Sequence, residues 1–149
     1  MTGVQTCALP IWVSALSKLG RIANGDIQKV LKISYDGLDR EEKKIFLDIA
    51  CFFKGKNKDF AINILNACGF STEIGISVLS DKSLISLSID NIITIHDLLQ
   101  AMAREIVWQE CEEPGKRSRL WNYDDIYHVL TKNKVRFNSI LIGIYSIYP

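Results

Sequence analysis

The fold is decided by the stretch Ile85-Ser86-Leu87-Ser88-Ile89-Asp90-Asn91-Ile92-Ile93-Thr94-Ile95-His96-Asp97-Leu98-Leu99. Apolar and polar residues alternate on both sides of Asp90-Asn91, and these two residue types tolerate left-handed turn conformations. The first part of the stretch therefore predicts a β-hairpin with one apolar face. From Asp97 onward the apolar residues recur at helical spacing. We expect a hairpin that leads directly into a helix.

The junction places one imidazole and one carboxylate, those of His96 and Asp97, at the start of that helix. A helix N-terminus presents unpaired N–H groups and a partial positive charge, which suits a phosphate. The residues alone leave two interpretations open. In one, Asp97 is the N-cap and His96 is a polar residue at a strand end. In the other, His96 faces a phosphate while Asp97 turns inward to hold the loop, because a second anion at the same place would repel the phosphate.

Three helices are predicted before the hairpin. The first begins with a capping box, in which Asp39 is the N-cap acceptor and Glu42 follows three residues later. It is the most apolar helix of the chain, so we expect it at the centre of the core. The second spans about 57–68 and the third begins near Ser71. The first helix should face inward with Ile45, Phe46, Ile49, Phe52 and Phe53. The second should do so with Ala61, Ile64, Leu65 and Cys68, and the third with Ile74, Val78 and Leu79.

Further helices are predicted on both sides of this region. Residues 12–19 and 26–31 form two short helices, the second with Ile27, Val30 and Leu31 on its inner face, followed by a turn at 34–38. The helix from Asp97 ends at Glu113-Pro114-Gly115, and a last helix begins at Asp124 or Asp125. The inward residues predicted for these two are Leu99, Met102, Ala103 and Ile106, and Ile126, Val129 and Leu130.

A winged-helix domain has this order of elements: several helices, then a hairpin, then another helix. We therefore expect a mostly α fold, a helical bundle with one two-stranded β-hairpin as its wing. The 149 residues suit one ordinary domain, and the net charge of +1 gives no strong field for nucleic acid or membrane. No apolar run reaches the roughly 20 residues of a membrane span.

Few residues offer chemistry for a site. The four cysteines lack the spacing of a zinc site and the density of a disulfide scaffold, and we expect Cys51 and Cys68 to be buried in helices. The only histidines are His96 and His128, the second of which we place on the surface. The chain has no recognisable nucleophile motif, metal-ligand spacing or glycine-rich phosphate loop. We therefore do not expect an enzyme.

A DNA-binding winged helix would read DNA through the helix before the hairpin and through the wing. The helix before the hairpin, about 71–81, would be the recognition helix of a DNA-binding winged helix. It carries Glu73 and Asp81, and its only cation is Lys82 at the end. The wing has no Lys or Arg, so no nucleic acid is expected as a partner. The basic loop Lys116–Arg119 is expected to be solvated or to contact a neighbouring domain.

The two ends of the sequence differ from its middle. Residues 1–11 have no charge and resemble the in-frame translation of a sequencing-adapter oligonucleotide, so we expect an assembly artefact, with an unusual natural leader as the alternative. Residues 135–149 include an uncharged run rich in Ile and Tyr, and we expect a non-native tail.

The middle of the chain resembles the plant intracellular immune receptors of the TIR, NB-ARC and leucine-rich-repeat type, which are disease-resistance proteins. The resemblance runs from Trp12 to about Lys134. Its motifs follow in order: Leu31-Lys32-Ile33-Ser34-Tyr35-Asp36-Gly37-Leu38, Ile45-Phe46-Leu47-Asp48-Ile49-Ala50-Cys51-Phe52-Phe53, Asp81-Lys82-Ser83-Leu84-Ile85, His96-Asp97-Leu98-Leu99, Arg104-Glu105-Ile106-Val107 and Glu113-Pro114-Gly115-Lys116-Arg117-Ser118-Arg119-Leu120-Trp121.

The resemblance implies a place for each part of the chain. Residues 12–33 would be the last helices of the NB-ARC helical segment, and residues 34–134 the winged-helix domain with its link toward the repeats. The family motif at the strand–helix junction is Met-His-Asp, and here it is Ile95-His96-Asp97. Isoleucine is an apolar replacement, and we expect Ile95 to point into the core.

The resemblance also implies a function in defence signalling. In the family the histidine contacts the β-phosphate of ADP and helps to hold the resting state, which implies that role for His96 and a supporting role in the loop for Asp97. ADP or ATP would be the cofactor of the intact receptor, with none bound by this chain alone. The partners would be the nucleotide-binding core, TIR and repeat domains, in the cytoplasm or also the nucleus.

Three kinds of protein therefore remain: a regulatory winged-helix module, which is favoured, a DNA-binding winged helix, and the non-functional product of a truncated gene.

Overall fold

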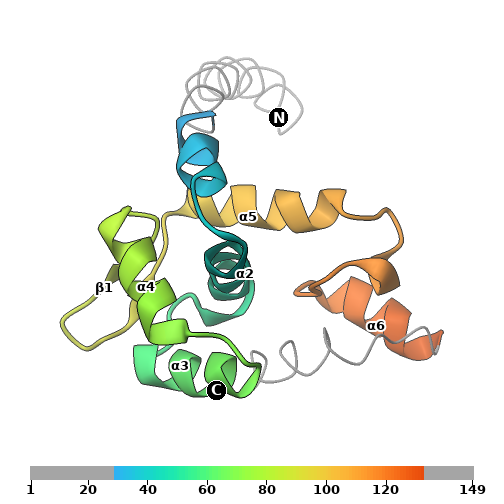
Figure 1. Cartoon of the computed structure of the whole chain (residues 1–149). Helices are drawn as coiled ribbons and strands as arrows, with labels where there is room; N and C mark the ends of the chain where they lie inside the picture. The colour runs from blue at the N-terminus through green and yellow to red at the C-terminus, as the bar shows by residue number, and fades with distance from the viewer. Residues whose placement is uncertain (1–28, 133–149) are drawn as a thin grey trace, which may run out of the picture.

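A computed structural model describes residues 29–132, which are mostly helical with one small hairpin (Figure 1). Residues 29–36 are helical and are followed by α2 (Arg40–Asp48), a π-helical turn η1 (Ile49–Phe53), α3 (Lys58–Ala67), α4 (Thr72–Asp81), β1 (Ser86–Leu87), β2 (Ile93–Thr94), α5 (Asp97–Gln109), a 3-10 turn η2 (Pro114–Lys116) and α6 (Tyr123–Thr131). This order confirms the predicted mostly α, winged-helix fold. The predictions for residues 1–11, 12–19, the first part of 26–31 and 135–149 lie outside the described residues.

The central helix is α2, which runs into η1 without a break. It begins with the predicted capping box: Glu42 N donates to Asp39 Oδ1 at 2.7 Å, and Asp39 N donates to Glu42 Oε2 at 2.9 Å. Figure 1 shows α2 in the middle, with α5 along one side and α4 along another. All five apolar residues predicted to face inward from this helix are buried: Ile45, Phe46, Ile49, Phe52 and Phe53.

Helix α4 approaches α2 through a glycine. A Cβ atom at Gly75 would overlap Cδ1 of Ile45, so only glycine permits this packing without a shift of the isoleucine. The buried face of α4 is set by this contact and consists of Thr72, Gly75, Ile76 and Leu79. The prediction that Ile74 faces inward is therefore wrong, because Ile74 lies on the opposite side of the helix and is exposed.

The hairpin is shorter than predicted. Strands β1 and β2 pair antiparallel with Leu87 opposite Ile93, and Asn91 adopts the expected left-handed conformation with φ 58°. The pairing ends at Leu87, so Ile89 lies in the turn and is fully exposed, contrary to its predicted place on the apolar face. The other edge of β2 is covered by the loop after η1, since Gly55 N donates to Ile93 O at 2.8 Å.

Three other residues predicted to face inward are exposed. Cys68 is the C-cap of α3, just before Gly69 turns the chain at φ 88°, and Ile62 is buried on that helix instead. Val30 and Leu130 are also exposed. The inner faces predicted for their two helices therefore included residues that lie on the solvent side. Cys51 is buried as predicted, and burial raises the pKa of its thiol to about 12.

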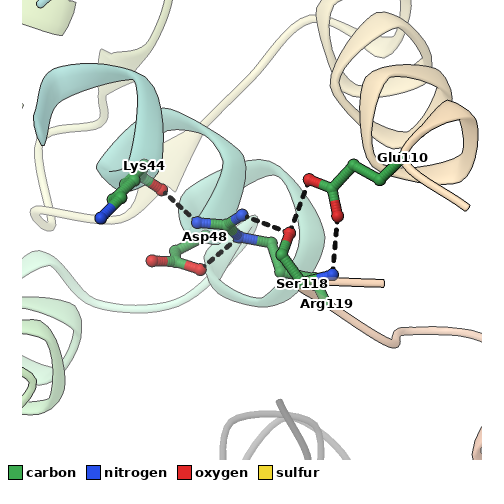
Figure 2. A network of polar contacts seen from close by, with 5 residues as sticks. All are labelled: Lys44, Asp48, Glu110, Ser118 and Arg119. Carbon is green, nitrogen blue, oxygen red and sulfur yellow. Dashed lines mark hydrogen bonds and ion pairs between the residues drawn. The ribbon is translucent and has the colours of Figure 1, made fainter. Parts of the chain in front are cut away.

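The two arginines of the basic loop are buried, contrary to the expectation of a solvated loop, whereas Lys116 and Ser118 are exposed. The Arg119 side chain is 9% exposed, and its Nε donates to Oδ1 of the equally buried Asp48 of α2 at 2.5 Å. The same guanidinium donates to Lys44 O at 3.0 Å and to Ser118 Oγ at 2.9 Å. Ser118 in turn donates to the carboxylate of Glu110, so the loop is bonded to both α2 and the end of α5 (Figure 2).

Arg117 makes a second set of contacts from the same loop. Its guanidinium donates to Cys111 O at 2.7 Å, to Glu112 O at 3.0 Å and to Asp125 Oδ2 of α6 at 2.9 Å. It also lies over the ring of Trp108, 5.7 Å from the centroid. Arg117 thus connects the end of α5 to α6, while Arg119 connects the same loop to α2.

We predict that Arg119→Met destabilises the protein by about 3–5 kcal/mol, because it leaves the buried carboxylate of Asp48 without its charge partner. The double variant Arg119→Met/Asp48→Leu should lose less than this single variant, since it removes both buried charges. Urea unfolding followed by circular dichroism gives the comparison. Lys116→Met in the same loop is the control and should change stability by about 0.5 kcal/mol or less. Equal losses for Arg119→Met and Lys116→Met would contradict the prediction.

Candidate functional site

His96 is the N-cap of α5, and it caps through its own side chain. Its backbone is extended, with φ −62° and ψ 141°, and its Nδ1 atom accepts a hydrogen bond from Leu98 N at 3.1 Å. The interpretation in which Asp97 is the N-cap is therefore wrong, because the extended backbone ends at His96 and Asp97 is already the first residue of the helix. Since Nδ1 is the acceptor, a neutral ring carries its proton on Nε2, and this N–H is directed away from the helix backbone as a donor.

The position of His96 is set by the residues before it in the strand. Ile93 and Ile95 are buried, whereas Thr94 and His96 are exposed, as the alternation of a strand requires. The expectation that Ile95 points into the core is confirmed. The core thus holds the backbone on the inner side and presents the imidazole at the surface, at the start of α5.

Asp97 does not turn inward. Its side chain is 90% exposed, and Oδ1 lies 2.5 Å from Nζ of Lys54, the residue that follows η1. The hydrogen bond from Lys54 and its positive charge lower the pKa of the Asp97 carboxyl below its ordinary value. As the first residue within α5, Asp97 points toward solvent, and Lys54 reaches it from the neighbouring loop. The expected inward orientation is therefore wrong.

A shallow pocket of about 330 Å³ lies beside His96. Hydroxyl groups line it from the end of α4 and from both strands, and its floor is apolar. Thr94 is on the same face of β2 as His96, and its hydroxyl is 2.6 Å from that of Ser86. The lining residues are Ser80, Ser83, Leu84, Ile85, Ser86, Thr94, His96 and Leu99.

These hydroxyl residues were missed as part of the site. The alternating pattern placed Ser86 and Thr94 on the outer face of the hairpin, where polar residues are ordinary. The signal that could have found them is register: residues 94 and 96 are two apart in one strand, and Ser86 pairs with Thr94 across the hairpin.

Other candidate chemistry is limited in the described part of the chain. Within residues 29–132 no group of three or more His, Cys, Asp or Glu side chains could hold a metal ion. No helix in that range is both long and apolar enough to cross a membrane. His128 is exposed on α6, as predicted for a surface residue.

Comparison with known proteins agrees with this geometry. Residues 39–111 match the family described as "Disease resistance protein Roq1-like, winged-helix domain". The chain is 53% identical over 127 residues to Disease resistance protein RUN1 of Vitis rotundifolia, which covers 85% of this chain and 10% of that protein. It is 39% identical over 137 residues to TMV resistance protein N of Nicotiana glutinosa, covering 91% of this chain and 12% of that protein.

The fold and these matches define a winged-helix domain of the disease-resistance type. The chain belongs to the plant TIR-NBS-LRR family of disease resistance proteins, as its motifs implied. It spans about a tenth of the length of the curated relatives that it matches.

We predict that the imidazole of His96 contributes to stability as a helix cap. His96→Ala should lower the free energy of unfolding by about 1 kcal/mol, because Leu98 N loses its acceptor. His96→Ser should stay close to the unsubstituted chain, since a serine hydroxyl is a good N-cap acceptor. Thermal melts of the two variants measure the difference. Equal melting temperatures for His96→Ala and the unsubstituted chain would show that the cap contributes nothing.

Proposed function

We propose that this chain is the regulatory winged-helix module of a nucleotide-switched plant immune receptor, in which His96 contacts the phosphate of bound ADP and helps to hold the resting state. The receptor would act in defence signalling, in the cytoplasm or also the nucleus. The observation that carries the proposal is the capping geometry of His96: Nδ1 accepts from the helix and Nε2–H is left for an acceptor outside it.

Two features at this end of α5 favour an anion. The helix N-terminus contributes a partial positive charge, and the imidazole contributes an N–H donor. The amino group of Lys54 is paired with the Asp97 carboxylate, so this carboxylate adds no unpaired negative charge beside them. A phosphate oxygen near Nε2 would accept a hydrogen bond and experience the helix dipole together. His96 lies at the surface, so a phosphate bound to another domain could reach it.

The switch would be a rigid-body movement. With ADP bound, the contact through His96 would hold the winged helix against the nucleotide-binding core of a longer chain of the kind its relatives have. Exchange of the nucleotide would remove that contact and free the domain to move. This chain would supply one wall of the nucleotide site and no catalytic group, so the module itself would not be an enzyme.

Binding to duplex DNA has less support. The exposed side of α4, which would enter the major groove, includes Glu73 and Ile74. A salt-dependent gel shift with duplex DNA would favour this alternative.

A substitution at His96 tests the proposed contact. We predict that His96→Ser, placed in a receptor that carries this chain in place of its own matching region, retains less ADP after purification and causes cell death without a ligand in leaf tissue. Serine keeps the helix cap and removes the imidazole, so the stability of the domain is unchanged and the effect is on the nucleotide. Full retention of ADP by His96→Ser would contradict the proposal, and Tyr127→Phe on the surface of α6 is the control.

The chain by itself should bind ADP very weakly and should not hydrolyse ATP, because it contributes only the His96 side of the site. Isothermal titration of residues 12–134 with ADP should therefore give no measurable heat of binding. A micromolar dissociation constant would show that the domain holds the nucleotide on its own and would contradict this division of the site.

A further inference from the structure

We propose that Lys54 is a positioning residue of the proposed phosphate contact: it bridges Asp97 and Gln100 and so fixes the first turn of α5 on which His96 sits. This inference rests on the proposed function. It gives Lys54 a role, and it explains how Asp97 would support the loop, as the resemblance implies, although its side chain is 90% exposed.

The bridge consists of three hydrogen bonds in series. Lys54 Nζ donates to Asp97 Oδ1 at 2.5 Å and to Gln100 Oε1 at 3.1 Å. The amide nitrogen of Gln100 then donates to Ala50 O at 3.0 Å. Asp97 and Gln100 are both in the first turn of α5, whereas Ala50 is in η1, so the bridge joins the start of one helix to the end of another.

The base of the bridge is rigid. Phe52 and Phe53, just before Lys54, are buried in the core, and Gly55, just after it, donates to Ile93 O of β2 at 2.8 Å. The backbone of Lys54 is therefore held on both sides. Its side chain is 34% exposed, against 90% for Asp97, which makes the lysine the better-packed partner of the pair.

The acceptor of Gln100 lies in the π-helical turn η1. Gln100 bonds to a carbonyl of that turn, so the geometry of η1 directly restrains α5.

The bridge orients the helix more than it stabilises the fold, because an exposed ion pair contributes little to stability. Removal of Asp97 would leave the Lys54 amino group beside the positive end of α5 without its counter-ion. Removal of Lys54 would release Asp97 and leave Gln100 with only its hydrogen bond to Ala50 O. Either change disturbs the same turn, so their effects on His96 should not add.

An NMR titration of the Asp97 carboxyl group in the whole chain tests whether Lys54 contacts Asp97. In Lys54→Met the pKa of Asp97 should rise toward its ordinary value, because both the hydrogen bond and the charge of Lys54 are lost; the smaller lowering effect of His96 remains. Lys54→Arg should keep the pKa low. Lys56→Met, two residues further along the same loop, is the matched control and should leave the pKa unchanged, with all melting temperatures alike.

The positioning role is tested by ADP release from the receptor used above. Lys54→Met should release ADP several-fold faster, and Lys54→Met/Asp97→Val no faster than Asp97→Val alone. Lys54→Arg and Lys56→Met should behave like the unsubstituted receptor.

Each contrary result has a distinct meaning. An unchanged Asp97 pKa in Lys54→Met would show that the bridge does not form and would overturn the inference. A raised pKa with unchanged ADP release, while His96→Ser accelerates release, would also overturn it but would leave the proposed function standing. Additive effects in the double variant would show that Lys54 and Asp97 act separately. Unchanged release in His96→Ser would overturn the proposed function, and this inference with it.

Discussion

The structure depends on the burial of one helix, α2 with its extension η1. Its apolar residues fill the centre of the described region, and helices α4 and α5 pack against it. One charged residue, Asp48, is carried into this interior, where an isolated carboxylate would be very costly. Burial raises the pKa of Asp48, and the Arg119 guanidinium opposes that shift. The need to pair Asp48 therefore brings a loop that is 71 residues away in sequence onto the central helix.

The location of the candidate site follows from the same helix. At its far end the chain turns at Gly55 and pairs with β2, which fixes the strand that leads directly into Ile95 and His96. Lys54 lies at that turn and reaches the first turn of α5. The core thus determines where His96 is presented, although His96 itself is exposed. A change in the packing of η1 would be transmitted to the site through backbone pairing and through the lysine side chain.

Local patterns predicted what depends on neighbours in sequence. The capping box of α2, the buried run from Ile45 to Phe53 and the inward direction of Ile95 were all available from spacing and residue type. Two kinds of feature could not be predicted from the sequence. The choice between His96 and Asp97 as N-cap depends on whether the helix begins one residue earlier or later, and the sequence pattern does not resolve a single residue. The burial of Arg119 depends on Asp48, which is distant in sequence, so a run of cations was indistinguishable from an ordinary solvated loop.

The assignment of the cap to His96 resolves a physical difficulty at this helix end. An aspartate N-cap would satisfy the backbone N–H groups but would place a carboxylate where the proposed phosphate would bind, and the two would repel. A histidine N-cap satisfies the helix through Nδ1, carries no negative charge, and adds an N–H donor on its other side. Asp97 is meanwhile held by Lys54, which neutralises it and restrains its direction. In the proposed function the two adjacent side chains would therefore have different roles: the imidazole would cap the helix and donate to the phosphate, and the carboxylate would fix the turn that carries both residues.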